Sequence, residues 1–161
     1  MSQLDGKIAL VTGASRGIGK AIATQLAQQG ATVIGTATSE NGAQAISDYL
    51  SEFGGKGFAL NVTDKESVDT TIKAINEAHG GIDILVNNAG ITRDNLLMRM
   101  KDDEWQDIID TNLTSIFTLS KAVLRGMMKK RFGRIVNIGS VVGSAGNAGQ
   151  ANYAAAKAGV I

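Results

Sequence analysis

The chain has 161 residues, with 16 Lys and Arg against 15 Asp and Glu, a formal net charge of +1, no cysteine, no proline and one histidine. This length suits a single globular domain that buries about 68–70% of its unfolded surface. The composition excludes disulfides, thiolate metal sites and cysteine nucleophiles, and the balanced charge argues against a broad nucleic-acid-binding face. We expect no metal site, because His79 has no second histidine to join it.

No segment has the pattern of a membrane span or an export signal. No apolar run reaches 18 residues, so the sequence predicts no membrane-spanning helix. The stretch from Met1 to Lys7 lacks a charged segment followed by an apolar one, which a signal peptide would show. We therefore expect a cytoplasmic protein.

Short apolar runs alternate with longer amphipathic segments along the chain. This alternation predicts parallel strands joined by right-handed helical crossovers, with helices on both faces of the sheet. We expect one doubly wound, Rossmann-like α/β domain over residues 1–161, with strand order 3-2-1-4-5. The expected strands are Ile8–Thr12, Thr32–Thr36, Gly57–Leu60, Ile82–Val86 and Arg134–Ile138, and the expected helices are Ile18–Gln29, Glu40–Phe53, Asp64–His79 and Asp102–Lys130.

Local signals refine the helix ends. Thr63 and Glu66 have the spacing of a capping box, and Gly30 and Gly133 stand where helices often end in a left-handed residue. Asn112 lies inside the longest helical segment despite its low helix propensity, which predicts a bend or division there. A further helix begins near Asn152.

A glycine-rich loop directly follows the first expected strand and opens the first helix. Glycines in such a turn let backbone N–H groups approach a diphosphate, and the helix N-terminus adds partial positive charge. The spacing is G-x-x-x-G-x-G rather than G-x-G-x-x-G, so a tight turn without a ligand remains an alternative for the loop alone. The residues concerned are Gly13, Ala14, Ser15, Arg16, Gly17, Ile18 and Gly19.

The end of the second strand favours NADP over NAD. NAD sites commonly carry an acid there, which binds the ribose 2′-hydroxyl, but this chain has Thr38 and Ser39 instead. Ser15, Arg16 and Thr38 can bind a 2′-phosphate, and Arg16 supplies charge. The alternative is that Arg16 points into water, and Glu40 lies close enough in sequence to oppose an anion.

Polar residues follow other strands or share one helix face. Tyr153 and Lys157 are four residues apart, so they lie on one face of the last helix. A fixed lysine ammonium favours a phenolate, which prepares a tyrosine for proton transfer, although an isolated pair of this kind is usually an ordinary surface contact. Ser140 follows the fifth strand and Asn88 the fourth, at the sheet edge where such folds bind ligands.

Together these motifs resemble the short-chain dehydrogenase/reductase family. The resemblance rests on the glycine loop, Asn87-Asn88-Ala89-Gly90, Asn112, Ser140 and Tyr153-x-x-x-Lys157, and it spans the whole chain. Within that family, the segments 35–47, 90–101 and 139–161 resemble bacterial reductases that act on 3-oxoacyl groups carried by acyl carrier protein.

The resemblance implies hydride transfer from NADPH to a ketone carbon, with Tyr153 as proton donor. Lys157 would hold the nicotinamide ribose and assist Tyr153, and Ser140 would bind the substrate carbonyl. Asn112 would hold a water that links Lys157 to solvent. Asn61 and Val62 would flank the adenine, and Asn88 would contact the ribose region.

The resemblance also implies partners. The run Lys129-Lys130-Arg131 would dock the acidic carrier protein, although a solvated helix end explains it equally well. The apolar surface of the longest helix implies a homo-oligomer, a tetramer in this family. Two alternatives remain open: a reductase of another ketone such as acetoacetyl-CoA, and a fragment that binds cofactor without turnover. The full doubly wound order has six strands and only five are expected here, so we expect a domain incomplete at its C-terminus.

Overall fold

The computed structural model describes residues 2–161 and contains a five-stranded parallel sheet in the order β3-β2-β1-β4-β5. This confirms the predicted fold class and strand order. The strands are β1 (Ile8–Val11), β2 (Thr32–Ala37), β3 (Lys56–Ala59), β4 (Ile84–Asn87) and β5 (Arg134–Asn137). The main helices are α1 (Gly17–Gln28), α2 (Glu40–Leu50), α3 (Lys65–His79), α4 (Asp102–Ile109), α5 (Ser115–Lys130), α6 (Val142–Ala145) and α7 (Ala151–Val160).

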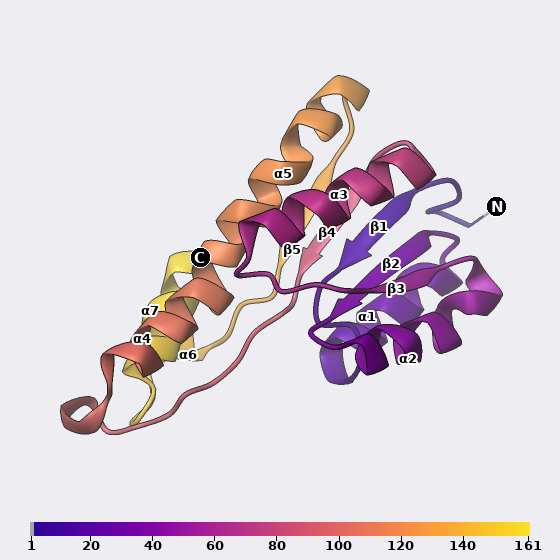
Figure 1. Ribbon diagram of the computed structural model, residues 1–161. Coiled ribbons are helices and arrows are strands. Elements are labelled where there is room, and N and C mark those ends of the chain that lie inside the picture. Colours follow the sequence, from indigo (N-terminus) through magenta and orange to yellow (C-terminus); the bar gives the residue numbers. More distant parts are fainter. Residues whose placement is uncertain (1) are drawn as a thin grey trace.

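The helices cover the sheet in two layers (Figure 1): α1 and α2 lie on one face, and α3 and α5 on the other. Each layer buries its own apolar cluster because alternate residues of a strand point to opposite faces. Leu10 and Leu85 pack toward α3 and α5, whereas Val11 and Val86 pack toward α1 and α2.

The strand order reverses at β1. From β1 the chain moves outward through β2 to β3, and then returns to place β4 and β5 on the other side. Open α/β sheets bind ligands at the carboxyl edge of such a reversal, because the loops diverge there and leave a crevice. The loops after β1 and β4 therefore meet at the position expected of a binding site.

The long helical segment is divided, as the sequence predicts. A five-residue π-helical turn, Asp110–Thr114, separates α4 from α5 and contains the buried Asn112. Single π-turns inside helices are frequently associated with functional sites. The helices α4, α6 and α7 lie together at one end of the molecule (Figure 1).

Two predicted helix ends are wrong and one is confirmed. Asp64, not Thr63, caps α3, since its carboxylate accepts hydrogen bonds from Glu66 and Ser67 N–H groups. The left-handed residue after α5 is Arg131, with φ 54°, not Gly133. Gly133 serves packing instead, because a Cβ there would overlap the Met127 side chain. Gly30, with φ 99°, follows α1 as predicted.

Two short elements escape sequence analysis. The helix α6 has four residues, and a three-residue 3-10 turn covers Leu97–Arg99. Such short turns contain too few residues to show a helical period. Within residues 2–161, no helix combines the length and apolarity that crossing a membrane requires.

Candidate active site

The conformation and packing of the loop after β1 both require glycine. Gly13 and Gly17 have φ of 63° and 58°, a region that favours glycine. Gly19 is buried, and a Cβ there would overlap the Gly13 carbonyl oxygen. The loop therefore needs glycine for two separate reasons, backbone conformation at the first two positions and space at the third.

Side chains from outside the loop hold its carbonyl groups. Asn88 Nδ2 donates to the carbonyl oxygens of Thr12 and Gly13 at 3.2 and 3.0 Å. Thr12 Oγ1 in turn accepts hydrogen bonds of 3.0 Å from the N–H groups of Asn88 and Ala89. Asn88 thus ties the loop after β4 to the glycine loop, and its side chain is already engaged inside the protein.

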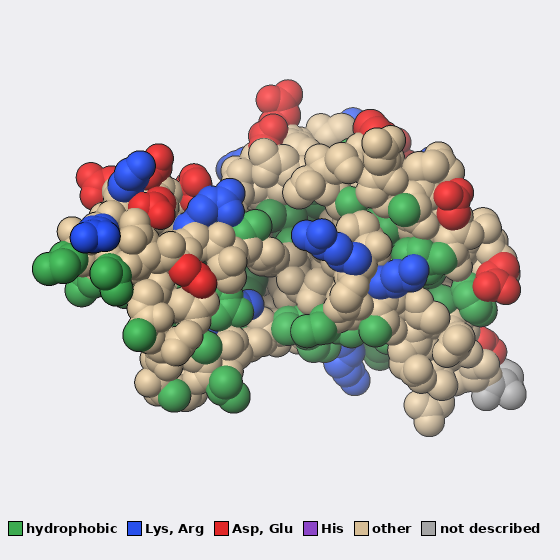
Figure 2. Space-filling model, turned by 90° about the horizontal axis from the view of Figure 1, so that it is seen from below, with side chains coloured by type: hydrophobic (Ala, Val, Ile, Leu, Met, Phe, Trp, Pro, Cys, Tyr) green, Lys and Arg blue, Asp and Glu red, His purple; other side chains and the backbone are tan. Residues whose placement is uncertain are grey.

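A cleft of about 490 Å³ opens along the carboxyl edge of the sheet above this loop. Figure 2 looks onto this edge, where the surface is hollowed and lysine and arginine side chains lie beside the hollow. Ala14 does not line the cleft; it is fully buried behind the loop. The predicted cofactor residues that do line it are Gly13, Ser15, Arg16, Gly17, Ile18, Gly19, Thr38, Asn61, Val62 and Asn88.

The positive charge at the cleft wall suits an anion. Arg16, at the N-cap of α1, and Thr38, after β2, both line the cleft and are exposed. Glu40 lies in the first turn of α2 and is not among the lining residues. The sequence left open whether Glu40 would oppose an anion here, and the fold places it outside the cleft wall.

A second cleft, of about 610 Å³, continues from the first. The two clefts share Arg16, Ile18, Asn88, Gly90 and Ile91, so they form one connected surface. The second cleft brings together three residues that the sequence analysis singled out from different segments: Ser140, Tyr153 and Lys157.

Lys157 is held by burial and by one carbonyl group. It is 6% exposed, and its Nζ donates to the Ile138 carbonyl oxygen at 2.9 Å. Burial lowers the pKa of Lys157 because the desolvated ammonium loses water. Its Nζ lies 5.7 Å from the centre of the Tyr153 ring, so the pair shares one helix face as the spacing predicts.

Tyr153 and Ser140 approach the cleft from separate elements. Ser140, between β5 and α6, accepts a hydrogen bond of 3.2 Å from Val142 N–H. Asn152 is fully buried beside Tyr153 and donates to the carbonyl oxygens of Arg93 and Glu104 at 2.9 and 3.1 Å. These contacts fix the start of α7 against α4 and the segment after β4.

Asn112 lies behind the clefts rather than in their walls. Its Oδ1 accepts a hydrogen bond from Ile91 N–H and its Nδ2 donates to the Ile91 carbonyl oxygen, both at 2.9 Å. Because Ile91 lines both clefts, Asn112 holds the cleft wall in place. Its side chain is thus committed to the backbone of Ile91.

Sequence analysis missed two residues that support the site, Tyr49 and Asn152. Tyr49, on α2, donates a hydrogen bond of 2.6 Å to the Ala14 carbonyl oxygen. No local pattern marks this contact, because the partners are 35 residues apart. Asn152 could have been noticed as a polar residue directly before Tyr153.

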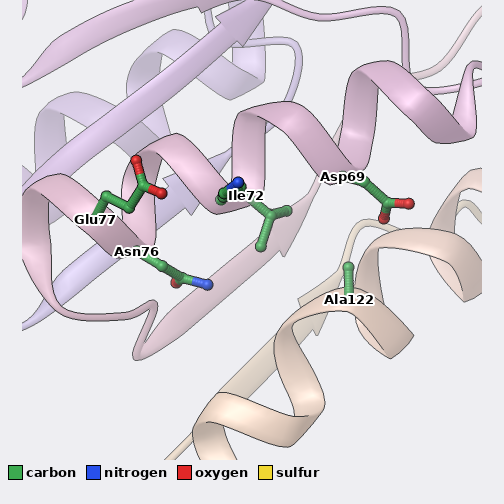
Figure 3. Close-up of a pocket in the computed structure, with 6 residues that line it drawn as sticks. Asp69, Ile72, Asn76, Glu77 and Ala122 are labelled. Atoms are coloured by element: carbon green, nitrogen blue, oxygen red, sulfur yellow. The ribbon is translucent and has the colours of Figure 1, made fainter.

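A further groove, of about 370 Å³, lies between α3 and α5, away from these clefts. Figure 3 shows Asp69, Ile72, Asn76 and Glu77 on α3 opposite the small side chain of Ala122 on α5. None of the motif residues lines this groove. Within residues 2–161, no group of three or more acidic or histidine side chains is arranged to hold a metal ion.

Comparison with known proteins gives one family model and several close relatives. A family model described as short chain dehydrogenase matches residues 7–161. The chain is 77% identical over 158 residues to "3-oxoacyl-[acyl-carrier-protein] reductase FabG" of Vibrio harveyi. It is 73% identical over 157 residues to the protein of the same name from Escherichia coli K12, and 64% identical over 159 residues to that of Pseudomonas aeruginosa.

The alignment covers the two partners unequally. In each of these three comparisons it includes 98% of this chain but 64% of the relative. The chain therefore spans a little under two thirds of the length of these relatives. The part in common contains the glycine loop and all of the residues that line the two clefts.

Proposed function

The chain belongs to the short-chain dehydrogenase family, and on that basis we propose that it acts in the NADPH-dependent reduction of 3-oxoacyl groups on acyl carrier protein to 3-hydroxyacyl groups, a step of fatty-acid synthesis. The observation that carries the proposal is the connected cleft. One part is built from the glycine loop, and the other holds Ser140, Tyr153 and Lys157. The similarity to proteins named 3-oxoacyl-[acyl-carrier-protein] reductase supports the substrate.

The cleft residues fit a dinucleotide with a 2′-phosphate. Gly19 lets the start of α1 pack closely against the glycine loop, since a Cβ there would overlap the Gly13 carbonyl oxygen. Arg16 supplies positive charge beside Ser15 and Thr38, and no acid lines this cleft. These observations support NADPH rather than NADH. Asn61 and Val62 would flank the adenine, and Asn88, whose side chain holds the loop, would face the ribose region.

When bound, the nicotinamide supplies the hydride that reduces the ketone carbon. Tyr153 donates the proton that the carbonyl oxygen takes up, and Ser140 donates a hydrogen bond to the same oxygen as negative charge develops. Lys157, which lines the same cleft, would hold the nicotinamide ribose with its ammonium. Burial in the fold keeps Lys157 beside Tyr153, so its ammonium lies close to the residue that gives up the proton.

We assign Asn112 a supporting part in proton supply. The family resemblance implies that it holds a water that links Lys157 to solvent; its amide is engaged with Ile91, which lines the same cleft as Lys157, so its support of such a water would pass through the cleft wall. The π-helical turn at this point supports such a role, since it departs from regular helical hydrogen bonding.

Acyl carrier protein would dock at the basic end of α5, but only part of the predicted patch is free to do so. Lys130 forms an ion pair with Asp83 at 2.8 Å, which leaves Lys129 and Arg131. Both lie at the end of α5 opposite the catalytic helix α7 (Figure 1), and α5 has 16 residues, about 24 Å of helix. An acyl group on carrier protein bound there would reach the cleft of a second copy more readily than the cleft of the same copy.

A homo-oligomer, which we take to be a tetramer, is consistent with that geometry. The face of α5 away from the sheet exposes the large apolar side chains of Phe117, Leu124 and Met128, which are 65%, 47% and 70% exposed. Exposed apolar surface of this kind favours association. A cytoplasmic location, as the sequence predicts, remains part of the proposal.

Oxidation of NADPH by the intact protein tests the function directly. We expect turnover with an acetoacetyl group on acyl carrier protein, and slower turnover with acetoacetyl-CoA. Faster turnover with the CoA thioester or with another ketone would assign a different substrate. Tight NADPH binding without oxidation in the presence of either thioester would identify a cofactor-binding protein without this activity.

A further inference from the structure

We propose that Tyr49 is a positioning residue for cofactor preference: its hydroxyl fixes the peptide between Ala14 and Ser15 so that the Ser15 N–H faces the anion-binding end of the cleft. The proposal rests on the function proposed above, because it explains how the chain presents the Ser15 N–H to a 2′-phosphate. Tyr49 itself touches neither cleft.

The contact is specific and spans two elements. Tyr49, in the last turn of α2, donates a hydrogen bond of 2.6 Å to the carbonyl oxygen of Ala14. Ala14 is fully buried, so its carbonyl oxygen is shielded from bulk water. Without the Tyr49 hydroxyl, a buried acceptor would lose its partner, which costs free energy.

Because the peptide bond is planar, this contact also sets the direction of the Ser15 N–H. The carbonyl and N–H of a trans peptide point in opposite directions, so a carbonyl turned toward Tyr49 turns the Ser15 N–H away from it. The preceding peptide shows the same rule, because the Gly13 carbonyl is bound by Asn88 while the Ala14 N–H donates to Thr36 at 2.8 Å.

The Ser15 N–H is available for a ligand. Ser15 lines the first cleft, and its N–H makes no hydrogen bond to any residue in the range 2–161. Arg16 follows as the N-cap of α1 and also lines the first cleft. Fixing the carbonyl of Ala14 therefore sets the direction of the Ser15 N–H, which would meet the phosphate beside Arg16.

The Tyr49 hydroxyl is protonated at neutral pH and can therefore donate. Burial raises the pKa of Tyr49 to about 12, because a phenolate would be poorly solvated there. The ammonium of Lys20 lies 5.0 Å from the centre of the Tyr49 ring and helps to hold the ring in place. Removal of the hydroxyl alone leaves these ring contacts available.

Tyr49→Phe tests the proposal in the intact protein, with dissociation constants measured for NADPH and NADH by equilibrium titration. A neutral hydrogen bond contributes about 0.5–1.5 kcal/mol, so we expect NADPH to bind about two- to thirteenfold more weakly. Only NADPH carries the phosphate, so NADH affinity should change by less than about twofold on the same reasoning. The ratio of the two constants is the readout, because general loosening of the fold would not alter it selectively.

Ser47→Ala is the matched control. Ser47 lies on the same helix and accepts a hydrogen bond of 2.9 Å from Gly57 N–H, a contact with β3 that does not involve the loop. It should lower thermal stability slightly and leave the ratio unchanged. Equal weakening of both cofactors by Tyr49→Phe, or no weakening of either, would overturn the role of Tyr49. If the unmodified protein bound NADPH and NADH with equal affinity, the proposed NADPH preference itself would be overturned, and the role of Tyr49 with it.

Discussion

Asp83 and Lys130 join the base of the sheet to the end of α5. Lys130 Nζ lies 2.8 Å from Asp83 Oδ1, and Asp83 Oδ2 accepts a hydrogen bond of 2.8 Å from Ile8 N–H. Burial of Asp83 opposes its ionisation, but the hydrogen bonds from Lys130 and Ile8 outweigh this and hold its pKa below the ordinary 3.8. The pair therefore anchors one residue of the basic run and leaves its neighbours exposed.

Asp83→Asn should lower the free energy of unfolding near neutral pH by about 1–2 kcal/mol. A hydrogen bond to a charged group contributes about 1.5–3 kcal/mol, and solvent screening of the partly exposed Lys130 reduces that figure. Because folding lowers the pKa of Asp83, its contribution is complete above pH 3.8 and is lost as the pH falls through the folded-state pKa. Denaturant unfolding of both proteins at decreasing pH should show the difference shrinking; a difference that grows on acidification would contradict this.

Gly19→Ala should prevent cofactor binding. Its Cβ would overlap the Gly13 carbonyl oxygen and crowd Asn88 Nδ2, so the loop would have to shift. Titration with NADPH should show no saturable binding. Gly126→Ala is the control, because a Cβ there meets nothing within 4 Å. Alanine is favoured over glycine within a helix, so this control should be stabilised by about 0.5–1 kcal/mol. Normal NADPH affinity in Gly19→Ala would refute the assigned loop geometry.

Arg16→Glu should reverse the charge that would meet a 2′-phosphate. Hydrogen bonds to charged groups contribute about 1.5–3 kcal/mol, so NADPH should bind about ten- to a hundredfold more weakly. NADH lacks the phosphate and should be affected much less. Titration of both cofactors distinguishes this from general damage, and comparable losses for the two would contradict the role of Arg16 in binding the 2′-phosphate.

Tyr153→Phe should abolish reduction while leaving NADPH bound. General acid catalysis contributes about a hundredfold to ten-thousandfold in rate, so kcat should fall by at least the lower figure. The phenylalanine ring keeps the shape of the cleft wall, and the dissociation constant for NADPH should therefore stay close to that of the unmodified protein. Single-turnover oxidation of bound NADPH is the measurement. Substantial turnover in this variant would rule out Tyr153 as the proton donor.

Arg131→Glu should raise KM for carrier-bound substrate by several-fold and leave KM for a small ketone unchanged. The reason is that reversal of a charge at the edge of an interface mainly alters association with the charged partner. Lys73→Glu, which makes the same charge change in the groove of Figure 3, is the control. If Arg131→Glu affects both substrates equally, the basic run serves only as a solvated helix end.

Much of the fold follows from local sequence. Strand and helix alternation predicts five parallel strands in the observed order, because parallel neighbours need a helical crossover. The motif positions at strand ends also predict one shared edge, where the structure places Ser15, Asn88 and Ser140. Tyr153 and Lys157 share a helix face, as their spacing of four residues requires.

The tertiary structure alone decides which side chains are free to act. Lys130 looks equivalent to Lys129 and Arg131 in the sequence, yet only Lys130 is paired with Asp83, 47 residues away. Likewise, Tyr49 carries no local motif and reaches Ala14 only because α2 packs beside the glycine loop. Sequence periodicity reports which face of an element is buried, whereas contacts between distant segments depend on how the elements pack. Residues that belong to motifs, such as Asn88 and Asn112, were therefore open to prediction from sequence, whereas Tyr49, which supports the loop without a motif, was not.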